Sequence, residues 1–108
     1  AVSTYTNVAT AVIATEIPGA PSQLLASRVQ KNRVTLDWMD NSTNETYFEI
    51  FRSTDGVTFA PIGTTGVNIS TYNDRSVSAN TRYWYYVRAC NTAGCSQNSE
   101  TIDVRTRR

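Results

Sequence analysis

The sequence predicts an all-β protein folded as an antiparallel sandwich of seven short strands. Three observations lead to this prediction. Apolar and polar residues alternate with period two in many short runs, and no window shows helical spacing. Turn-forming residues separate the runs at intervals of roughly eight to twelve residues. Serine and threonine together make up 26 of the 108 residues, a composition that favours strands and turns.

Each expected strand presents one apolar face. In residues 34–38, Leu36 and Trp38 point to the same side, and in residues 48–52 so do Phe48 and Ile50. The longest run, 83–89, repeats the pattern. The remaining expected strands are 23–29, 57–64, 69–72 and 101–105. A pair of aligned sheets would bury a core made of Leu36, Trp38, Phe48, Ile50, Tyr83, Tyr85 and Val87.

Turn residues separate these strands. Asp55-Gly56 lies between two apolar stretches and is a strong hairpin signal, because glycine accepts a positive φ. Residues 40–44 form a polar loop. Pro18 and Pro21 end whatever precedes them, because proline cannot donate a ladder hydrogen bond.

Composition excludes several classes of function. The chain has a mass of 12.0 kDa and a net charge of +1, and it contains no histidine and two cysteines. No apolar run is long enough to span a membrane, and no nucleic-acid footprint stands out. Histidine-dependent triads and zinc sites of the usual kind are excluded. We therefore expect no catalysis, no metal and no cofactor. Arg105, Arg107 and Arg108 form a small basic end, interpreted as a solvated terminus.

The two cysteines indicate the compartment. Cys90 and Cys95 flank four residues, 91–94, that suit a hairpin loop, and cysteines at matching ends of a hairpin can reach disulfide distance. We expect a disulfide, with two reduced thiols as the alternative. Because a disulfide persists only in an oxidising compartment, the expected location is secreted or on the cell surface.

A series of landmarks runs in order between Pro21 and Thr106: Pro21, Leu24 and Ala26; Val34-x-Leu36-x-Trp38; residues 40–46; Phe48-Glu49-Ile50-x-Arg52-Ser53; Asp55-Gly56; Tyr72-x-Asp74; Asn80-Thr81-x-Tyr83-x-Tyr85-x-Val87-x-Ala89-x-Asn91; and Gly94-x-Ser96. With these landmarks the stretch resembles a fibronectin type III domain of the bacterial extracellular type. The resemblance implies a Greek-key, immunoglobulin-like sandwich. It makes Trp38 the core anchor and Tyr83 the donor or acceptor of a corner hydrogen bond, with Val77 where leucine is usual. The cysteine pair departs from the family pattern.

Residues 1–17 do not fit that domain, which we place at 18–108. Residues 5–11 resemble residues 98–104, an offset of 93 residues that is close to one domain of this family. We therefore expect the remnant of a preceding repeat, its last strand followed by a linker. A fortuitous strand-like stretch is the alternative. The chain begins at Ala1 without methionine, so we expect it to be part of a longer protein.

An aromatic patch is the first choice for a partner surface. On the expected outer sheet face lie Tyr47, Phe51, Trp84, Tyr86 and Arg88. Exposed rings can stack on sugars, but they also pair across strands, which is commoner. An arginine beside them would make an ordinary cation–π contact.

The resemblance implies a non-catalytic spacer or accessory module in a multidomain secreted or cell-surface protein, one acting on polysaccharide or protein. The partners would be neighbouring domains of the same chain. The alternative is a carbohydrate- or protein-binding module that uses the aromatic patch.

Overall fold

A computed structural model describes residues 16–108, so most of the expected strand remnant lies outside the described residues. Within residues 16–108 the chain forms strands and no helix. The strands are β1 (Ser22–Val29), β2 (Val34–Met39), β3 (Tyr47–Ser53), β4 (Ala60–Thr65), β5 (Thr71–Asp74), β6 (Arg82–Asn91), β7 (Gly94–Cys95) and β8 (Ile102–Arg105). The described part therefore offers no helix that could cross a membrane.

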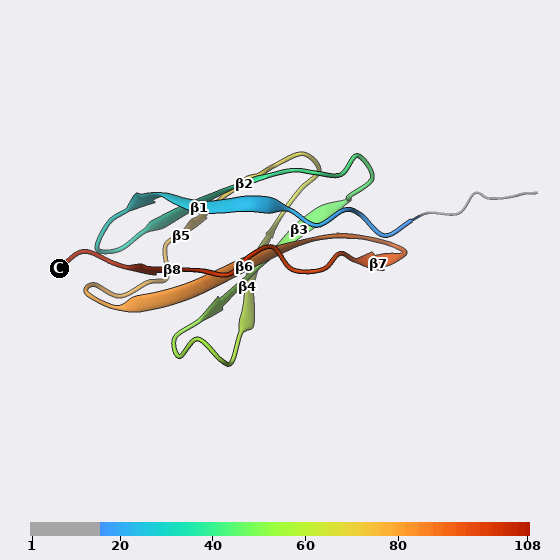
Figure 1. The fold of residues 1–108 in the computed structure, drawn as a ribbon. Coiled ribbons are helices and arrows are strands. Elements are labelled where there is room, and N and C mark those ends of the chain that lie inside the picture. Colours follow the sequence, from blue (N-terminus) through green and yellow to red (C-terminus); the bar gives the residue numbers. More distant parts are fainter. Residues whose placement is uncertain (1–15) are drawn as a thin grey trace, which may run out of the picture.

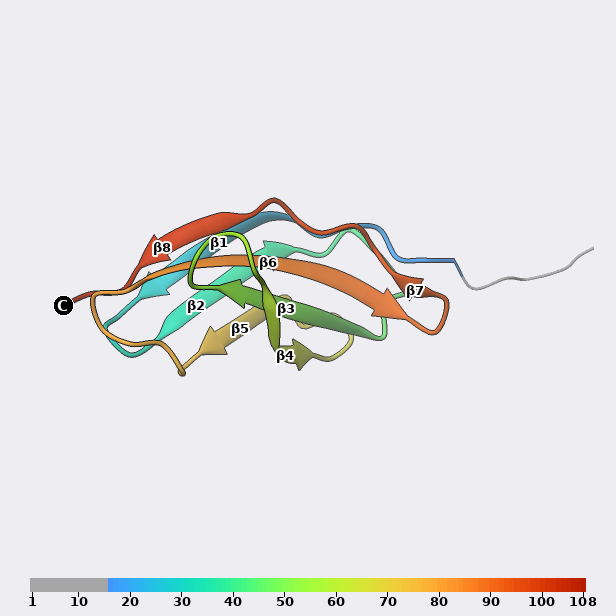
Figure 2. The same ribbon diagram turned by 90° about the horizontal axis from the view of Figure 1, so that it is seen from below.

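The strands form two sheets packed face to face (Figures 1 and 2). One sheet has the order β1-β2-β5, and the other has the order β4-β3-β6, with β7 and β8 both paired to β6. Every pairing is antiparallel. The predicted fold class is confirmed. The chain passes into β1 at one end of the sandwich, and residue 108 lies at the other (Figure 1).

We call the two ends of the sandwich the N-terminal pole and the C-terminal pole. The N-terminal pole comprises residues 16–21, the β2–β3 loop (40–46) and the β6–β7 turn (92–93). The C-terminal pole comprises the β1–β2 turn (30–33), the β5–β6 loop (75–81) and residues 106–108.

The eighth strand arises because the last edge of the larger sheet is split. Between β7 and β8, Ser96 Oγ accepts a hydrogen bond from the Ala89 N–H (2.9 Å), and Ser99 Oγ accepts one from the Val87 N–H (3.0 Å). The N–H groups of Ser96 and Ser99 donate in turn to the carbonyls of Ala89 and Val87. Hydroxyl oxygens thus replace main-chain acceptors, and this segment stays attached to β6 without forming a regular ladder.

Two predicted strands are displaced along the chain. The expected strand 57–64 begins only at Ala60, because Asp55 Oδ1 accepts the N–H groups of Val57 and Thr58, both at 2.8 Å, and holds them in a turn. The expected strand 69–72 is found at Thr71–Asp74. Ile69 belongs to the preceding turn, where its N–H donates to the Gly66 carbonyl at 3.2 Å.

The core lies between the sheets and is almost wholly apolar. Trp38 meets Phe48 edge-on, with ring centroids 5.5 Å apart. Tyr83 reaches the β5–β6 corner, where its hydroxyl accepts the Ser78 N–H at 2.7 Å beside the buried Val77. The residues that the sequence assigns to the core are all buried: Leu36, Trp38, Phe48, Ile50, Tyr83, Tyr85 and Val87.

Burial predicts a large difference between two leucines on paired strands. Leu36 in β2 is fully buried, whereas Leu25 in β1 is 50% exposed. Leu36→Ala should lower the free energy of unfolding by about 2–5 kcal/mol through lost burial and the cavity left behind. Leu25→Ala should change it by roughly 0.5 kcal/mol or less. Urea unfolding of both variants measures this, and equal losses would contradict the described packing.

Candidate functional site

The predicted aromatic patch lies on the outer face of the larger sheet. Tyr47 and Phe51 come from β3, and Trp84, Tyr86 and Arg88 come from β6. The register of the antiparallel pair places Phe51 opposite Tyr86. Because directly paired residues point to the same side of a sheet, the odd-numbered residues of β3 share a face with the even-numbered residues of β6. The structure therefore brings the predicted residues onto one face. Tyr47 is 37% exposed, and the other four are half-buried.

The ring faces at the centre of this patch are covered by other side chains of the chain. Phe51 stacks on Tyr86 with centroids 4.8 Å apart and ring planes 20° apart. The Arg88 guanidinium lies over the Phe51 ring at 4.9 Å. Phe59, from the β3–β4 loop, packs at a tilt on Tyr86, also at 4.8 Å. We call Arg88, Phe51, Tyr86 and Phe59 the aromatic ladder. Its pairing across strands stabilises the sheet.

Sequence reasoning did not include Phe59 in the patch. Residues 57–64 were expected to be a strand, which gave no reason to place this ring over β6. A usable signal was present in Asp55, because an aspartate side chain can accept backbone N–H groups that follow it and so hold the next residues in a turn. The covering segment is the turned one that Asp55 caps.

Trp84 is covered differently. The Arg82 guanidinium lies 4.7 Å from its ring centroid and is itself held by Asp103 at 2.8 Å. On another side, Gly56 comes so close that a Cβ at this position would lie 3.0 Å from Trp84 Cε2. Gly56 also has a φ of 77°, which favours glycine. The β3–β4 loop thus packs on the indole through a residue that has no side chain.

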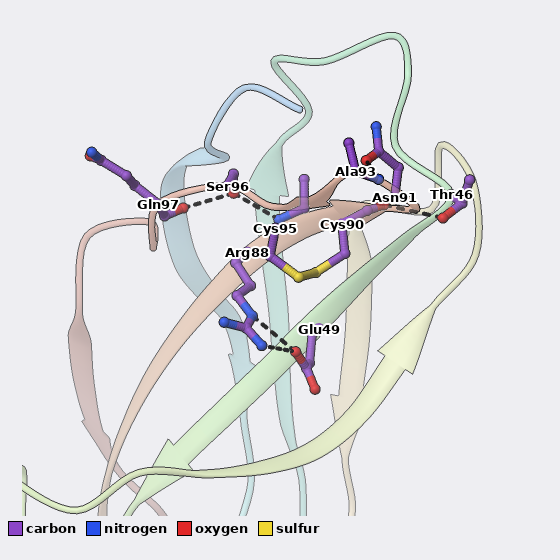
Figure 3. Close-up of a disulfide and its surroundings, with 10 residues drawn as sticks. Thr46, Glu49, Arg88, Cys90, Asn91, Ala93, Cys95, Ser96 and Gln97 are labelled. Carbon is purple, nitrogen blue, oxygen red and sulfur yellow. Dashed lines mark hydrogen bonds and ion pairs between the residues drawn. A yellow bond between two sulfur atoms is a disulfide. The ribbon is translucent and has the colours of Figure 1, made fainter. Parts of the chain in front are cut away.

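A disulfide closes the β6–β7 turn (Figure 3). Cys90 and Cys95 are directly opposite in the ladder, with Cα atoms 4.0 Å apart. The predicted bond is present, but the turn is shorter than expected. Asn91 pairs with Gly94, so Thr92 and Ala93 alone form the turn instead of residues 91–94. Such a two-residue turn holds little material for a binding loop.

Glu49 lies beside this disulfide, but the group is not a cation site. A Glu49 oxygen and the two sulfur atoms lie within 4.8 Å of one another. Sulfurs bonded to each other are not thiolates, and only a thiolate is a strong metal ligand. The carboxylate is already bound by Arg88 at 2.7 Å, as Figure 3 shows.

The residues that precede β1 are attached to the N-terminal pole. The Glu16 carbonyl accepts hydrogen bonds from the side-chain amides of Asn44 (2.8 Å) and Asn91 (2.7 Å). The Asn41 amide donates to the Ala20 carbonyl at 2.9 Å. Asn91 is 8% exposed and follows Cys90 directly, so the disulfide-closed turn positions this contact. The sequence predicted a linker here but not its attachment.

A second feature that the sequence did not reveal is a buried polar cluster between the sheets. Asp74 in β5 is 1% exposed. Its carboxylate accepts hydrogen bonds from the Tyr85 hydroxyl at 2.7 Å and from Arg52 Nη1 at 2.9 Å. Ser76 donates to it at 2.7 Å through its hydroxyl, and its N–H donates at 3.1 Å.

These contacts set the protonation states. Burial opposes ionisation of Asp74, but the hydrogen bonds from Tyr85, Ser76 and Arg52 together outweigh it and lower the pKa of this carboxyl. Burial, with the neighbouring carboxylate, raises the pKa of Tyr85 far above its ordinary value. Near neutral pH Asp74 therefore stays ionised and Tyr85 stays neutral, as expected of a structural contact. A general acid or base would instead have a pKa near the working pH, so that it could exchange its proton.

Asp74 should make the protein acid-sensitive. Because its folded pKa is lowered, its contribution is complete above the unfolded value of about 3.9 and is lost as the pH falls through the folded pKa. Asp74→Asn should cost about 3 kcal/mol at pH 7, because it leaves Arg52 without its charged partner. The difference between wild type and variant should shrink between pH 5 and pH 2.

Urea unfolding of both proteins across this range measures the effect. The pKa values of Asp55, about 2, and of Glu45 are also lowered, so the wild type alone does not isolate Asp74. A difference between the two proteins that stays constant with pH would refute the assignment.

The disulfide should stabilise the fold modestly. In the chain-entropy model, opening a loop this short lowers the free energy of unfolding by roughly 2 kcal/mol. Dithiothreitol should lower the thermal midpoint of the wild type, whereas a Cys90→Ala/Cys95→Ala variant should be insensitive to it. Thermal unfolding followed by circular dichroism measures both, and identical wild-type midpoints in either redox state would argue against this contribution.

Comparison with known proteins identifies the fold. No family model matches the chain. It is 33% identical over 95 residues to Roundabout homolog 3 of Homo sapiens, covering 82% of this chain and 7% of that protein's length. Among solved structures, the fibronectin type III domain of human fibronectin type III domain containing protein 3 superposes with a TM-score of 0.72 at 20% identity, covering 88% of this chain and 91% of that one.

A β-1,2-glucanase from Parabacteroides distasonis superposes with a TM-score of 0.76 at 23% identity. This match covers 88% of our chain but 13% of the glucanase chain. The chain thus corresponds to a small part of the longer proteins that it resembles. The chain has the fibronectin type III fold. This is shown by the strand order of the two sheets, by the buried Trp38, by the hydrogen bond that Tyr83 makes at the β5–β6 corner, and by the similarity to these solved structures.

Proposed function

We propose that the chain is a non-catalytic fibronectin type III module of a multidomain secreted or cell-surface protein, and that it sets the distance and orientation between its neighbours. The observation that carries this proposal is the fixed backbone at both poles. At the N-terminal pole, two asparagine amides hold the Glu16 carbonyl. At the C-terminal pole, the Arg107 carbonyl accepts the Asn80 N–H, and Arg107 Nε donates to the Val29 carbonyl, both at 2.9 Å.

Fixed attachment at both ends is what a spacer needs. A flexible tether transmits distance only on average, whereas a rigid body with attached ends also transmits orientation. The two attachment points lie at opposite ends of the sandwich (Figure 1). A neighbour on either side would therefore be held away from the other by the length of the domain.

Two further observations support the proposed setting. The disulfide supports an oxidising compartment, and hence a secreted or cell-surface location. The glucanase that shares this fold over 13% of its length supports an accessory role in a bacterial protein that acts on polysaccharide. The sequence landmarks of the bacterial type agree with this setting.

The alternative is a module that binds carbohydrate or protein through Tyr47, Phe51, Trp84, Tyr86 and Arg88. Covered ring faces on Phe51, Tyr86 and Trp84 count against stacking on sugars, because stacking needs an open ring face. We treat binding at this aromatic patch as an outcome that would overturn the spacer proposal.

The spacer proposal predicts that the segment before β1 is as rigid as the sandwich. Backbone amide order parameters of Ile17, Gly19 and Ala20 should be about 0.85, as in the strands. In an Asn44→Ala/Asn91→Ala variant the order parameter of Ile17, next to the released Glu16 carbonyl, should fall below about 0.6 while the strands keep their values. Nitrogen-15 relaxation measures both. Asn98→Ala is the matched control, because Asn98 is exposed and its side chain makes no hydrogen bond within residues 16–108.

Two results would contradict the proposal. One is a mobile segment 17–20 in the wild-type chain. The other is binding of neutral polysaccharides that is lost in Trp84→Ala while the fold is retained, which would establish the aromatic surface as a binding site.

A further inference from the structure

The cationic side chains are gathered at one pole. Six of the ten basic residues come from three separate segments: Arg28, Lys31, Arg33, Arg75, Arg107 and Arg108. We call them the basic cluster. By contrast, residues 16–27, 38–47 and 89–104, which supply the N-terminal pole, contain no lysine or arginine. Although the net charge is only +1, the positive charges are therefore concentrated at the C-terminal pole.

Hydrogen bonds bring the three segments together. Arg107 Nε donates to the Val29 carbonyl at the end of β1, and the Asn80 N–H donates to the Arg107 carbonyl. The C-terminal residues are thus held between the β1–β2 turn and the β5–β6 loop. Sequence alone suggested a solvated basic terminus, because it showed only the arginines close together along the chain. The fold adds Arg28, Arg33 and Arg75 to them.

None of these six residues is used in an ion pair within residues 16–108. The ion pairs of the described part involve Arg52, Arg82 and Arg88. The carboxylate at this end of β5, Asp74, is buried and already bound by Arg52. Five guanidinium groups and one ammonium group thus share one surface without local neutralisation, which costs free energy through mutual repulsion.

The surface between these side chains is hollowed and lined by hydrogen-bond donors. One open hollow is lined by Ser27, Arg28, Arg33, Thr35 and Asn73, with no carboxylate among them. Thr35 Oγ1 donates to Asn73 Oδ1 at 2.6 Å, which leaves the Asn73 N–H groups as donors. A second hollow is lined by Gln30, Asn32, Arg33 and Arg75.

Arg33 borders both hollows and has an unused donor. Its Nε atom is buried and has no acceptor within the described residues. A buried donor without an acceptor costs free energy in the unbound chain. Guanidinium groups present paired donors that match carboxylate and sulfate oxygens, so the shape of the site favours oxyanions.

We propose that the basic cluster binds an acidic polysaccharide, through its carboxylate or sulfate groups. Two donor-lined hollows that share Arg33 fit anionic groups repeated along one chain better than they fit a single small anion. The choice of a glycan over a nucleic acid rests on the proposed extracellular function, since acidic polysaccharides are the abundant polyanions outside cells. The site lies on the pole opposite the disulfide and shares no residue with the aromatic ladder.

The test uses two variants of the 108-residue chain with equal net charge. Lys31→Gln/Arg75→Gln/Arg108→Gln removes three exposed cations of the cluster. Thr43→Glu/Gln97→Glu/Asn98→Glu adds three anions at exposed positions outside the cluster, so each variant has a net charge of 1 − 3 = −2. Affinity for heparin, polygalacturonate and neutral dextran is measured by calorimetry at 50 and 200 mM NaCl.

We expect the wild type to bind heparin or polygalacturonate and not dextran, with affinity that falls steeply with salt because binding releases counterions. The cluster variant should bind about 100-fold more weakly, since each cation contributes about fivefold. The control should stay within about threefold. Sulfate and carboxylate recognition are distinguished by which glycan binds.

Three results would overturn the proposal. The first is no binding to either acidic glycan at 50 mM NaCl, and the second is equal weakening in both variants. The third is tighter binding of single-stranded DNA or of anionic lipid vesicles than of either glycan. The rigidity of residues 17–20 is measured separately, so a failure here leaves the spacer proposal standing.

Discussion

The carboxylate of Asp74 links the two sheets through hydrogen bonds. Without it, only apolar packing would hold the sheets together at this position. The carboxylate extends from β5 in the smaller sheet to Arg52 in β3 and Tyr85 in β6 of the larger one. A buried charge without its partners costs several kcal/mol, so any displacement of β5 relative to β3 and β6 is penalised. Apolar contacts tolerate small shifts far better, and the polar cluster therefore fixes how the sheets are aligned.

The register between β3 and β6, in which Arg52 lies opposite Tyr85, explains the character of the outer face. Once β3 and β6 are in register, Phe51 and Tyr86 must meet, and the rings cover one another. Arg88 and Phe59 cover what remains. An aromatic stripe on a sheet can thus be a way to stabilise two long neighbouring strands, because cross-strand pairs contribute to sheet stability wherever their side chains touch. The basic surface differs in this respect, because its side chains form no ion pairs within the described residues.

Much of the fold could be predicted from local pattern. Period-two alternation predicted which side of residues 34–38, 48–52 and 83–89 faces inward, because strand geometry alone determines this. The spacing of Cys90 and Cys95 predicted their bond for a similar reason. Local pattern could not reveal the partners of Asp74, the attachment of Glu16, or the grouping of Arg33 with Arg75 and Arg107. Each of these depends on segments that meet only after folding.

Side chains that compete with the backbone were also beyond the pattern. Asp55 takes the N–H groups of Val57 and Thr58, and so an apolar stretch that alternates like a strand is turned instead. The same competition splits the last edge of the larger sheet, where hydroxyls of Ser96 and Ser99 accept from β6.

The split edge strand affects how the domain behaves next to other domains of the same fold. A long, regular border strand is a template on which another chain can add and start a fibril. Here the border breaks after two residues, and the opposite border, β4, contains Pro61, which has no N–H to offer. The larger sheet therefore offers no long, regular border on which a neighbouring copy could add, even at the high local concentration of a tandem array.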